Sequence, residues 1–370
     1  MKRKEHKISF CITCMNRRHH LEATLLKNIV ENKDYPNLEF VLLDYNSQDG
    51  LEDWAKQTLT PYIHSGKLVY YKTYDPVFFN HSHAKNMALR LGSGDIVCSI
   101  NADHYIGQRF ANFVNAVFNS SPKKVITPIP KAYYQLKKTH PPSGSWGKVC
   151  VNKDDFIAIR GYDEKMIKYG NDDIDLINRL ELYGVKRYNI KKAEYCSVIS
   201  HDNEERYSSK ERLNNVFKVY IKYLSPNRSE IIFLFKNKKY ERFVLKDEAE
   251  SGAHNYQTTY LQKKYHYRYT IEDFLWEEGR WEQANSIILL TYGAGFDQKL
   301  VSTKSIKESE FYELSNTSLI DELSTFNYTQ YNLNMMRKNL NDKKIQVNES
   351  NAFGSGVVYK NFDRKIGIEL

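Results

Sequence analysis

The chain has 370 residues, of which 41% are hydrophobic and 27% are charged, and these proportions exclude a wholly disordered protein. Its formal net charge of +9 favours an anionic partner, such as a charged small molecule, an acidic polysaccharide or a membrane surface. Nucleic acid is not expected as the partner, because the chain contains no recognised nucleic-acid-binding motif.

The first 130 residues alternate short β-branched runs with amphipathic stretches, which is the pattern of a mainly parallel α/β sheet. The predicted strands are residues 8–13, 38–44, 67–72, 96–100 and 124–127. The predicted helices between them are residues 18–31, 81–91 and 110–118, the second of which Gly92 and Gly94 terminate.

The second half of the chain gives weaker signals. Residues 128–147 are rich in Pro, Gly, Ser and Tyr and are predicted to form a long loop, a kind of segment that is often functional. Further elements are predicted as helices at 172–183, 209–223 and 271–278 and as strands at 197–201 and 231–235. A domain boundary is placed near Pro226, so that residues 1–225 form one α/β domain and residues 226–370 a smaller region of mixed or helical structure.

No apolar run reaches the roughly 18 residues that a membrane-spanning helix needs, and the basic N-terminus lacks the features of a signal peptide. The protein is therefore expected in the cytoplasm, with peripheral contact to the inner face of the membrane as an option. Five cysteines, mostly within apolar segments, are predicted to be buried thiols. Cys11 and Cys14 form a C-x-x-C pair, but no second pair follows at metal-ligand spacing, which favours packing over zinc binding.

Polar residues follow three of the predicted strands: Asp44, Asp103 and His201. In open α/β sheets, ligands bind outside the carboxyl ends of the strands, so residues just past a strand are the first candidates for a site. Any one of them, taken alone, is better explained as a cap or turn residue. Three in matching positions favour a functional site at this edge of the sheet.

Three segments of the first half resemble the GT-A glycosyltransferases when they are taken in order. ISFCITCMNRRHHLEATL is similar to the family's first strand and nucleotide-contacting turn, and LEFVLLDYNSQDG to its second strand and acidic turn. HSHAKNMALRLGSGDIVCSINADHYIG is similar to the helix, strand and D-x-D region. The resemblance covers residues 7–224 and implies a Rossmann-like α/β domain with helices on both faces of the sheet.

Two later segments narrow this resemblance. RGYDEKMIKYGNDDIDLINRLELYG resembles the C-terminal motif of the β-galactosyltransferase and N-acetylgalactosaminyltransferase branch, which includes chondroitin-polymerase-like bacterial enzymes. ISHDNEERYSSKER resembles the metal-binding histidine segment that follows it. The branch implies a metal-dependent, inverting hexosyltransferase that moves Gal, GalNAc or a related sugar from a UDP-sugar to a glycan or lipid-linked glycan in surface polysaccharide synthesis.

The resemblance assigns the chemistry to named residues. Asp173, aligned from the shared Asn178-Arg179-Leu180, takes the place of the base that deprotonates the acceptor hydroxyl, and Asp172 takes that of a residue holding the acceptor or donor sugar. The alternative is that both aspartates only favour the positive end of the following helix. Asp103 and His201 take the place of the metal ligands, an oxygen and nitrogen set that suits Mn2+ or, less well, Mg2+.

The remaining predicted contacts concern the nucleotide and the acceptor. The residues expected to bind the nucleotide sugar are Thr13, Asn16, Arg17, Asp44, Lys85, Asn101 and Asp103. Trp146 is expected to stack on an acceptor sugar, or else to anchor its loop, and Lys85 equally fits a solvated helix face.

The chain departs from the family where Asn101 replaces the first acid of the metal triplet. This departure keeps open an alternative function, that of a weakly active or inactive protein that binds sugar nucleotides or acts as a scaffold. The C-terminal region is expected to contact acceptor, membrane or a second subunit, and homo-oligomerisation is possible.

Overall fold

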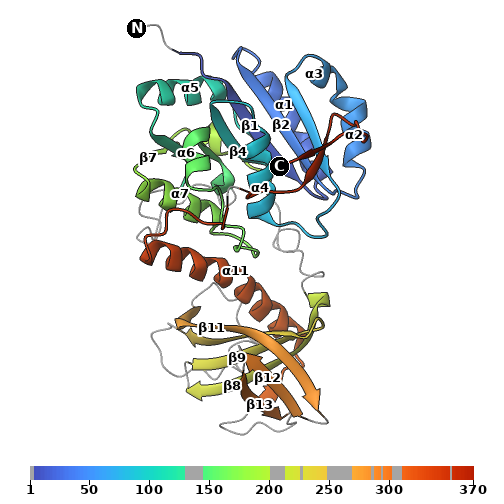
Figure 1. Ribbon diagram of the computed structural model, residues 1–370, viewed down its shortest axis with the longest axis vertical. Coiled ribbons are helices and arrows are strands. Elements are labelled where there is room, and N and C mark those ends of the chain that lie inside the picture. The colour runs from blue at the N-terminus through green and yellow to red at the C-terminus, as the bar shows by residue number, and fades with distance from the viewer. Residues whose placement is uncertain are drawn as a thin grey trace. The chain divides into compact units, whose positions relative to one another are not determined.

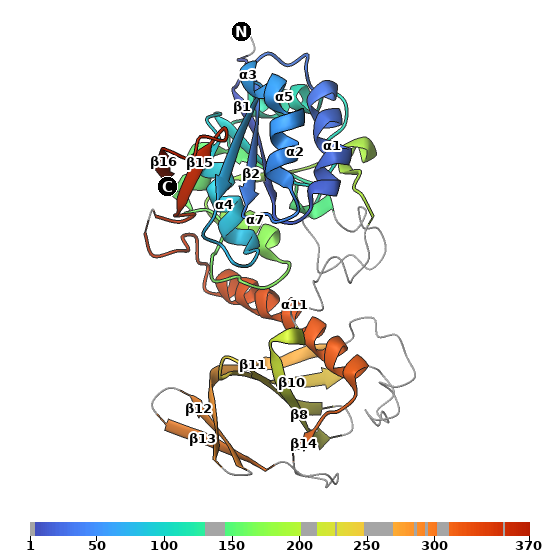
Figure 2. The same ribbon diagram turned by 90° about the vertical axis from the view of Figure 1, so that its right-hand side faces the viewer.

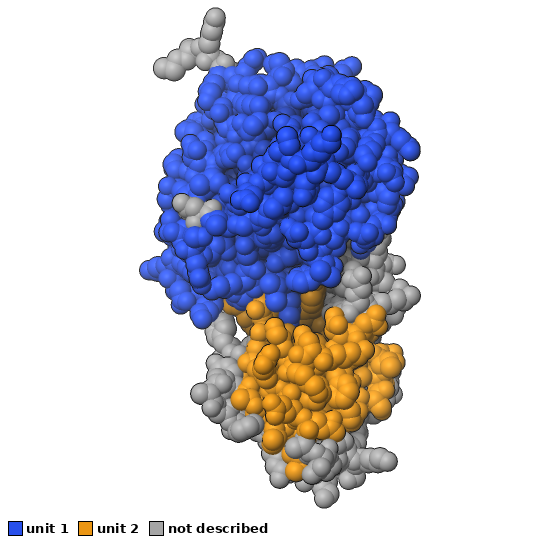
Figure 3. Space-filling view, turned by 45° about the vertical axis from the view of Figure 1, so that its right-hand side comes forward, with its two compact units in different colours: residues 1–200, 335–370 blue, residues 201–334 orange. Residues whose placement is uncertain are grey.

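The computed structural model describes residues 4–129, 145–200, 213–225, 228–247, 269–284, 287–292, 295–301, 311–350 and 352–370. The chain forms two compact units (Figure 3). Unit 1 combines Met1–Ser200 with Met335–Leu370, and unit 2 comprises His201–Asn334.

Unit 1 contains a nine-stranded sheet in the order β16-β15-β3-β2-β1-β4-β6-β5-β7. The strands are β1 (Ile8–Cys14), β2 (Leu38–Tyr45), β3 (Leu68–Thr73), β4 (Ile96–Asn101), β5 (Lys124–Thr127), β6 (Val149–Asn152), β7 (Lys186–Asn189), β15 (Val357–Lys360) and β16 (Gly367–Glu369). The run β3-β2-β1-β4 is parallel throughout, as is the pair β5-β7, while β6 is antiparallel to both of its neighbours. The predicted α/β class with a mainly parallel sheet is confirmed.

The central strands are apolar on both faces because helices cover both sides of the sheet. On one face, Phe10 and Ile12 of β1 pack with Leu21 and Leu25 of α1 (Arg18–Glu31). The same cluster includes residues of α2 (Leu51–Thr58) and α5 (Phe110–Ser120), and Figure 2 shows α1 and α2 on one side of the sheet. Helix α4 (His81–Leu91) packs on β1, β2 and β4 and buries a separate set that includes Met87.

The predicted elements of the first half agree with the structure. Helices 18–31 and 81–91 have the predicted bounds, and strand 124–127 does as well. Three helices were not predicted: α2 and α3 (Thr60–His64), which follow residues 46–50, and α6 (Lys153–Ala158). The predicted strand 197–201 is only an isolated bridge between His104 and Val198, and residue 201 lies outside the described residues.

Unit 2 is built on a seven-stranded antiparallel sheet in the order β13-β12-β11-β10-β9-β8-β14 (Figure 1). Its strands are β8 (Val216–Ser225), β9 (Arg228–Phe235), β10 (Lys239–Asp247), β11 (Tyr269–Ala284), β12 (Ile287–Tyr292), β13 (Gly295–Val301) and β14 (Tyr312–Glu313). Helix α11 (Thr317–Asn341) begins in this unit and covers one face, where Leu323 and Phe326 pack with Phe233 and Phe243.

Two predicted helices in this part of the chain are wrong. Most of residues 209–223 is strand β8, in which Val219 and Ile221 face one cluster and Tyr220 the other, the two-residue period of a strand. Residues 271–278 lie within β11, where pairing with β10 and β12 overrides the helical propensity of a Glu-rich sequence. The predicted strand 231–235 is confirmed within β9.

The last part of the chain returns to unit 1. Residues 335–370 belong to that unit, and β15 pairs with the edge strand β3. The Asn361 side chain accepts a hydrogen bond from the backbone of Tyr70, and Phe353 packs edge-on against Phe156. The units therefore divide at Ser200 and again at Met335, and they differ from the single boundary expected near residue 225.

Two smaller predictions can be compared with the structure. All five cysteines are buried and free, and burial raises the pKa of both Cys11 and Cys14, which agrees with packing rather than metal binding. Within the part of the chain that the structure describes, no helix combines the length and apolar character that crossing a membrane requires.

Candidate active site

The polar residues predicted at strand ends meet at one edge of the unit 1 sheet. In the parallel register, Thr13 of β1 lies opposite Asn101 of β4, and the neighbouring Cys14 lies opposite Asp44 of β2. Asp44 in turn lies opposite Lys72 of β3. Since parallel strands end at the same edge, four adjacent strands present their carboxyl-end residues together.

The turn after β1 is tied to the turn after β2. Asn16 has a φ of 55°, in the left-handed region, and its backbone N–H donates to the Ser47 hydroxyl at 3.1 Å. Its side-chain oxygen accepts from the backbone N–H of Gln48 at 2.7 Å. Arg17 is half-buried and donates to the Asn16 carbonyl at 3.0 Å. These bonds fix Asn16 and Arg17 in the turn after β1, and their contact with a nucleotide stays a prediction.

Asp44 is fully buried and both of its carboxylate oxygens are bonded within the protein. Oδ1 accepts from the backbone N–H of Ser47 at 2.7 Å, and Oδ2 accepts from the Tyr70 hydroxyl at 2.7 Å. The Lys72 ammonium lies 3.1 Å from the same Oδ2 and 3.2 Å from Glu52. The structure thus shows that Asp44 anchors the end of β2, and the nucleotide contact expected of it stays a prediction.

Lys85 of α4 lies between the two aspartates that begin α7 (Asp172–Leu182). Its Nζ is 2.7 Å from Oδ2 of Asp172 and 2.8 Å from Oδ1 of Asp173, and its side chain is only 5% exposed. The two carboxylates carry one more charge than the single ammonium neutralises. Lys85 therefore binds the predicted acidic pair, rather than extending into solvent as a surface residue.

Tyr162, which the sequence analysis did not select, completes this cluster. Its hydroxyl donates to Oδ1 of Asp173 at 2.9 Å, and the Lys85 ammonium lies 4.9 Å from the centre of its ring. Burial raises the pKa of the Tyr162 hydroxyl well above its usual value, and the nearby side chain of Ser99 on β4 opposes this rise. Ser99 and Asn101 share one face of β4 because strand side chains alternate. The aspartate pair therefore lies near the strand that leads to Asp103.

The two aspartates are placed in different electrostatic environments. Burial and the neighbouring charge of Asp172 raise the pKa of Asp173 to about 6, although Lys85 opposes this shift. For Asp172, burial acts in the same direction, but the charges of Lys85 and His81 outweigh it and lower the pKa. The carboxylates in turn hold the pKa of Lys85 well above its usual value against the effect of burial. A carboxylate that titrates near neutrality is suited to general-base chemistry.

Asn101 and Asp103 follow β4, and Asp103 is 8% exposed. A Cβ atom added to Gly147 would lie 2.5 to 2.7 Å from the Asn101 side chain, so the loop carrying Trp146 passes directly over this position. Trp146 itself is half-buried in a short 3-10 helix (Ser145–Gly147). Asn101 and Trp146 are therefore brought near each other, as a shared site requires.

Of the two predicted metal ligands, Asp103 is described by the structure. The Asp103 carbonyl accepts from the backbone N–H of Ile199 at 2.9 Å, which places the chain two residues before His201 beside Asp103. His201 itself lies outside the described residues. Among the residues that are described, no group of three His, Cys, Asp or Glu side chains is arranged to hold a metal ion. The oxygen atoms of Asp103 and Asn101 fit a hard divalent cation.

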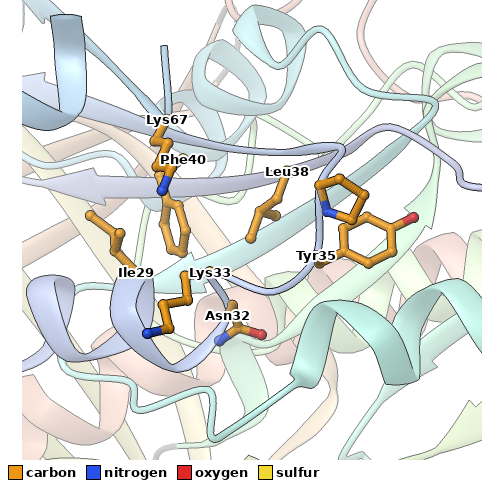
Figure 4. A pocket seen from close by; sticks show the side chains of 8 residues that line it. Ile29, Asn32, Lys33, Tyr35, Leu38, Phe40 and Lys67 are labelled. Carbon is orange, nitrogen blue, oxygen red and sulfur yellow. The ribbon is translucent and has the colours of Figure 1, made fainter. Parts of the chain in front are cut away.

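A pocket elsewhere in unit 1 does not coincide with these residues (Figure 4). It is lined by Ile29, Asn32, Lys33, Tyr35, Pro36, Leu38, Phe40 and Lys67. Leu38 begins β2, whereas Asp44 is near its end, so the pocket lies toward the amino ends of the strands. It has no part in the candidate site.

The structure therefore brings the predicted residues into two neighbouring groups at the carboxyl edge. Thr13, Asn16, Arg17, Asp44 and Asn101 gather at the ends of β1, β2 and β4, while Lys85, Asp172 and Asp173 gather between α4 and α7. Tyr162 and Lys72 also contact these residues, Asn86 binds the backbone of Tyr162, and none of the three was predicted from the sequence. Tyr162 stands in the quoted segment RGYDEKMIKYGNDD, eleven residues before Asp173, but a buried tyrosine gives no signal that separates it from core packing.

Residues 132–202 match a family model described as the N-terminal domain of galactosyltransferase. This segment holds Trp146, Asp172 and Asp173, so the predicted resemblance to glycosyltransferases is confirmed over the residues that carry the acidic motif. No curated protein sequence matches the chain.

Solved structures of glycosyltransferases are similar to this chain. The mannosyltransferase PcManGT from Pyrobaculum calidifontis, in complex with GDP-Man and Mn2+, is 19% identical with a TM-score of 0.44, over 56% of this chain and 61% of its own. TarS 1-349 from S. aureus with UDP is 16% identical with a TM-score of 0.40, over 56% and 66%. Glucosyl-3-phosphoglycerate synthase from Mycobacterium tuberculosis, with Mn2+, UDP-Glc and phosphoglyceric acid, is 17% identical with a TM-score of 0.37, over 54% and 74%. The chain spans less than two thirds of the first two structures.

Proposed function

We propose that the protein is an inverting glycosyltransferase that moves a hexose, Gal, GalNAc or a relative, from a UDP-sugar to a glycan acceptor during surface polysaccharide synthesis. The observation that supports it most is the buried contact of Lys85 with Asp172 and Asp173, the two aspartates that lie within the segment matched by the galactosyltransferase model. A structural role as helix-capping acids alone does not require a buried lysine between them.

In this proposal Asp173 is the general base. It accepts the proton of the acceptor hydroxyl as that oxygen attacks the anomeric carbon, and the bond from this carbon to the diphosphate breaks with inversion. UDP leaves with the electron pair of that bond. The pKa of Asp173, at about 6, leaves the carboxylate mostly ionised at neutral pH and still able to take a proton.

The other residues bind and orient the substrates. Asp172, whose lowered pKa keeps it ionised, is placed to hold a sugar hydroxyl. Thr13, Asn16 and Arg17 lie in the turn after β1, where we place the nucleotide, and we assign Trp146 to stacking on an acceptor sugar ring. A divalent cation, Mn2+ or Mg2+, would be held by Asp103 with His201 and would neutralise the charge of the leaving diphosphate. A cytoplasmic location, membrane contact and homo-oligomerisation remain predictions.

The experiment that tests the proposal is UDP release from purified full-length protein with Mn2+ and a panel of UDP-sugars, followed by assay of Asp173→Asn. We expect release with at least one donor, and a loss of at least about 100-fold in transfer for D173N with UDP-sugar binding retained. Asp154→Asn is a matched control, because Asp154 also lies in the first turn of a helix but is exposed. Full turnover by D173N would contradict the assigned base.

Asn101, in place of an acid, favours a second candidate, a protein that binds sugar nucleotides without turnover. The same donor panel separates the two functions. Binding of UDP without release from any donor, with or without a glycan acceptor, would support the second candidate and contradict the first.

A further inference from the structure

Two donors converge on a single oxygen of Asp173. The Tyr162 hydroxyl lies 2.9 Å from Oδ1, and the Lys85 ammonium lies 2.8 Å from the same atom. Among the hydrogen bonds of the described residues, none reaches Oδ2. The Asp173 side chain is 13% exposed, against 7% for Asp172, so it is the more exposed of the two aspartates.

Tyr162 is held in place from three directions. The Asn86 side chain accepts from its backbone N–H at 2.7 Å and donates to its carbonyl at 3.0 Å. Asn348, which comes from the C-terminal segment, donates to the same carbonyl at 2.8 Å. The side chain is fully buried and packs against Phe156. The position of the hydroxyl is therefore set by α4, by the loop before α7 and by residues close to the C-terminus.

We propose that Tyr162 is a positioning residue, which together with Lys85 binds Oδ1 of Asp173 so that Oδ2 is the atom that accepts the proton from the acceptor hydroxyl. This inference rests on the proposed function, in which Asp173 is the base. A carboxylate free to rotate would present either oxygen in many directions, whereas one fixed by two donors presents one oxygen in one direction.

The groups that face Asp173 determine how the loss of the tyrosine hydroxyl changes its titration. Lys85 and Tyr162 lower its pKa, whereas burial and Asp172 raise it, and His81 acts on Asp172 from α4. Removing the hydroxyl takes away a donor to the ionised form, so the pKa rises above its value of about 6. Because the base must be ionised, the acidic limb of the rate profile moves to higher pH.

The test is Tyr162→Phe, which keeps the buried ring, assayed for kcat and KM of transfer between pH 5 and 9. We expect the acidic limb to move up by about one pH unit and kcat at pH 7 to fall about tenfold, with donor KM within about twofold. Tyr35→Phe is the matched control, since it removes one partly buried phenol hydrogen bond, to the His6 carbonyl, far from the site. An acidic limb that does not move in Y162F overturns the inference.

A second variant distinguishes a specific effect on the position of Tyr162 from a general loss of folding. Asn348→Ala leaves the Tyr162 hydroxyl in place but removes one bond to its backbone, so we expect a smaller shift of the limb in the same direction. The comparison with Asp173→Asn separates the proposed role of Tyr162 from the proposed function of the protein. An inactive D173N with an unmoved limb in both Y162F and N348A overturns only the role of Tyr162, whereas a fully active D173N overturns the proposed function itself.

Discussion

Nζ of Lys85 lies 2.8 Å from Oδ1 of Asp173, although 88 residues separate them in the sequence. Both groups are largely buried, with 5% and 13% of their side chains exposed. The buried lysine and the two carboxylates stabilise the fold only when all are present. Removing the positive charge or the negative charges leaves a buried charge without a partner. This relationship connects the helix that follows β3 with the acidic motif near the middle of the chain.

Replacing Lys85 by Met should shift the pH range in which the protein is active. Without the ammonium, the pKa of Asp173 rises further above about 6, so the base is protonated at neutral pH and transfer is lost there. The expected result is a profile whose acidic limb moves by at least about one unit to higher pH, measured as kcat/KM for UDP release. Lys165→Met, an exposed lysine on the neighbouring loop, should leave the profile unchanged.

The same substitution should also destabilise unit 1. Breaking a buried ion pair by removal of one partner costs about 3–5 kcal/mol in the free energy of unfolding. Adding Asp172→Asn to K85M removes one of the two uncompensated carboxylates, so we expect the double variant to be more stable than K85M alone. The free energies of unfolding of the wild type, K85M and the double variant, measured in urea at pH 7, check this order of stability. A double variant that is less stable than K85M would contradict it.

Asp44→Asn should lower stability, because the carboxylate accepts from Tyr70 and pairs with Lys72 in a fully buried position. The Glu52 carboxylate still neutralises part of the Lys72 charge in this variant. We therefore expect the free energy of unfolding, measured in urea, to fall by about 2–3 kcal/mol. Donor KM measured on the same variant tests the predicted nucleotide contact. A rise of about tenfold or more supports that contact, and an unchanged KM restricts Asp44 to anchoring β2.

Gly147→Ala should impair the site through contact with Asn101. The added methyl would come within 2.5 to 2.7 Å of the Asn101 side chain, which must move away from its position after β4. We expect higher donor KM and a higher Mn2+ requirement in UDP release, with little change in the urea midpoint because the Asn101 side chain can shift. Gly184→Ala is the comparison: a Cβ there meets no atom within 4 Å, but the φ of 94° strains any side chain, so this variant should be less stable without a change in donor KM or Mn2+ requirement. Wild-type metal dependence in G147A would argue against Asn101 as part of the site.

Asn339→Ala tests the attachment of the C-terminal segment to unit 1. The buried side chain donates to Asp163 at 2.9 Å and to Asp175 at 3.0 Å, and burial already raises the pKa of Asp175. Loss of the Asn339 amide should lower the free energy of unfolding by about 2–3 kcal/mol at pH 7, and by less at pH 4, where Asp175 with its raised pKa takes up a proton. Urea unfolding at both pH values is the measurement. Asn341→Ala, at the exposed end of α11, should have no comparable effect, and an equal loss at both pH values would contradict this account.

Much of unit 1 could be predicted from the sequence because its signals are local. Helices 18–31 and 81–91 carry apolar residues at helical spacing, and the central strands are short β-branched runs bounded by turns. The acidic residues at strand ends were identified because a strand's length and direction fix where its carboxyl end lies. Asp173 and Asp172 stood in a motif whose order could be read without knowing what surrounds it.

The tertiary structure alone decided which of these residues meet. Residues 209–223 and 271–278 suggested helices, but pairing between strands made them part of a sheet. Residues 335–370 belong to unit 1 although they come last in the chain. Asn348 and Asn86 both donate hydrogen bonds to the Tyr162 carbonyl from segments that are far from it in the sequence. Hydrogen bonds and ion pairs between such distant segments depend on how the helices and strands pack against one another. No local pattern of residues in the sequence indicates that packing. The chain alone thus identified the acids, and the fold determined their partners.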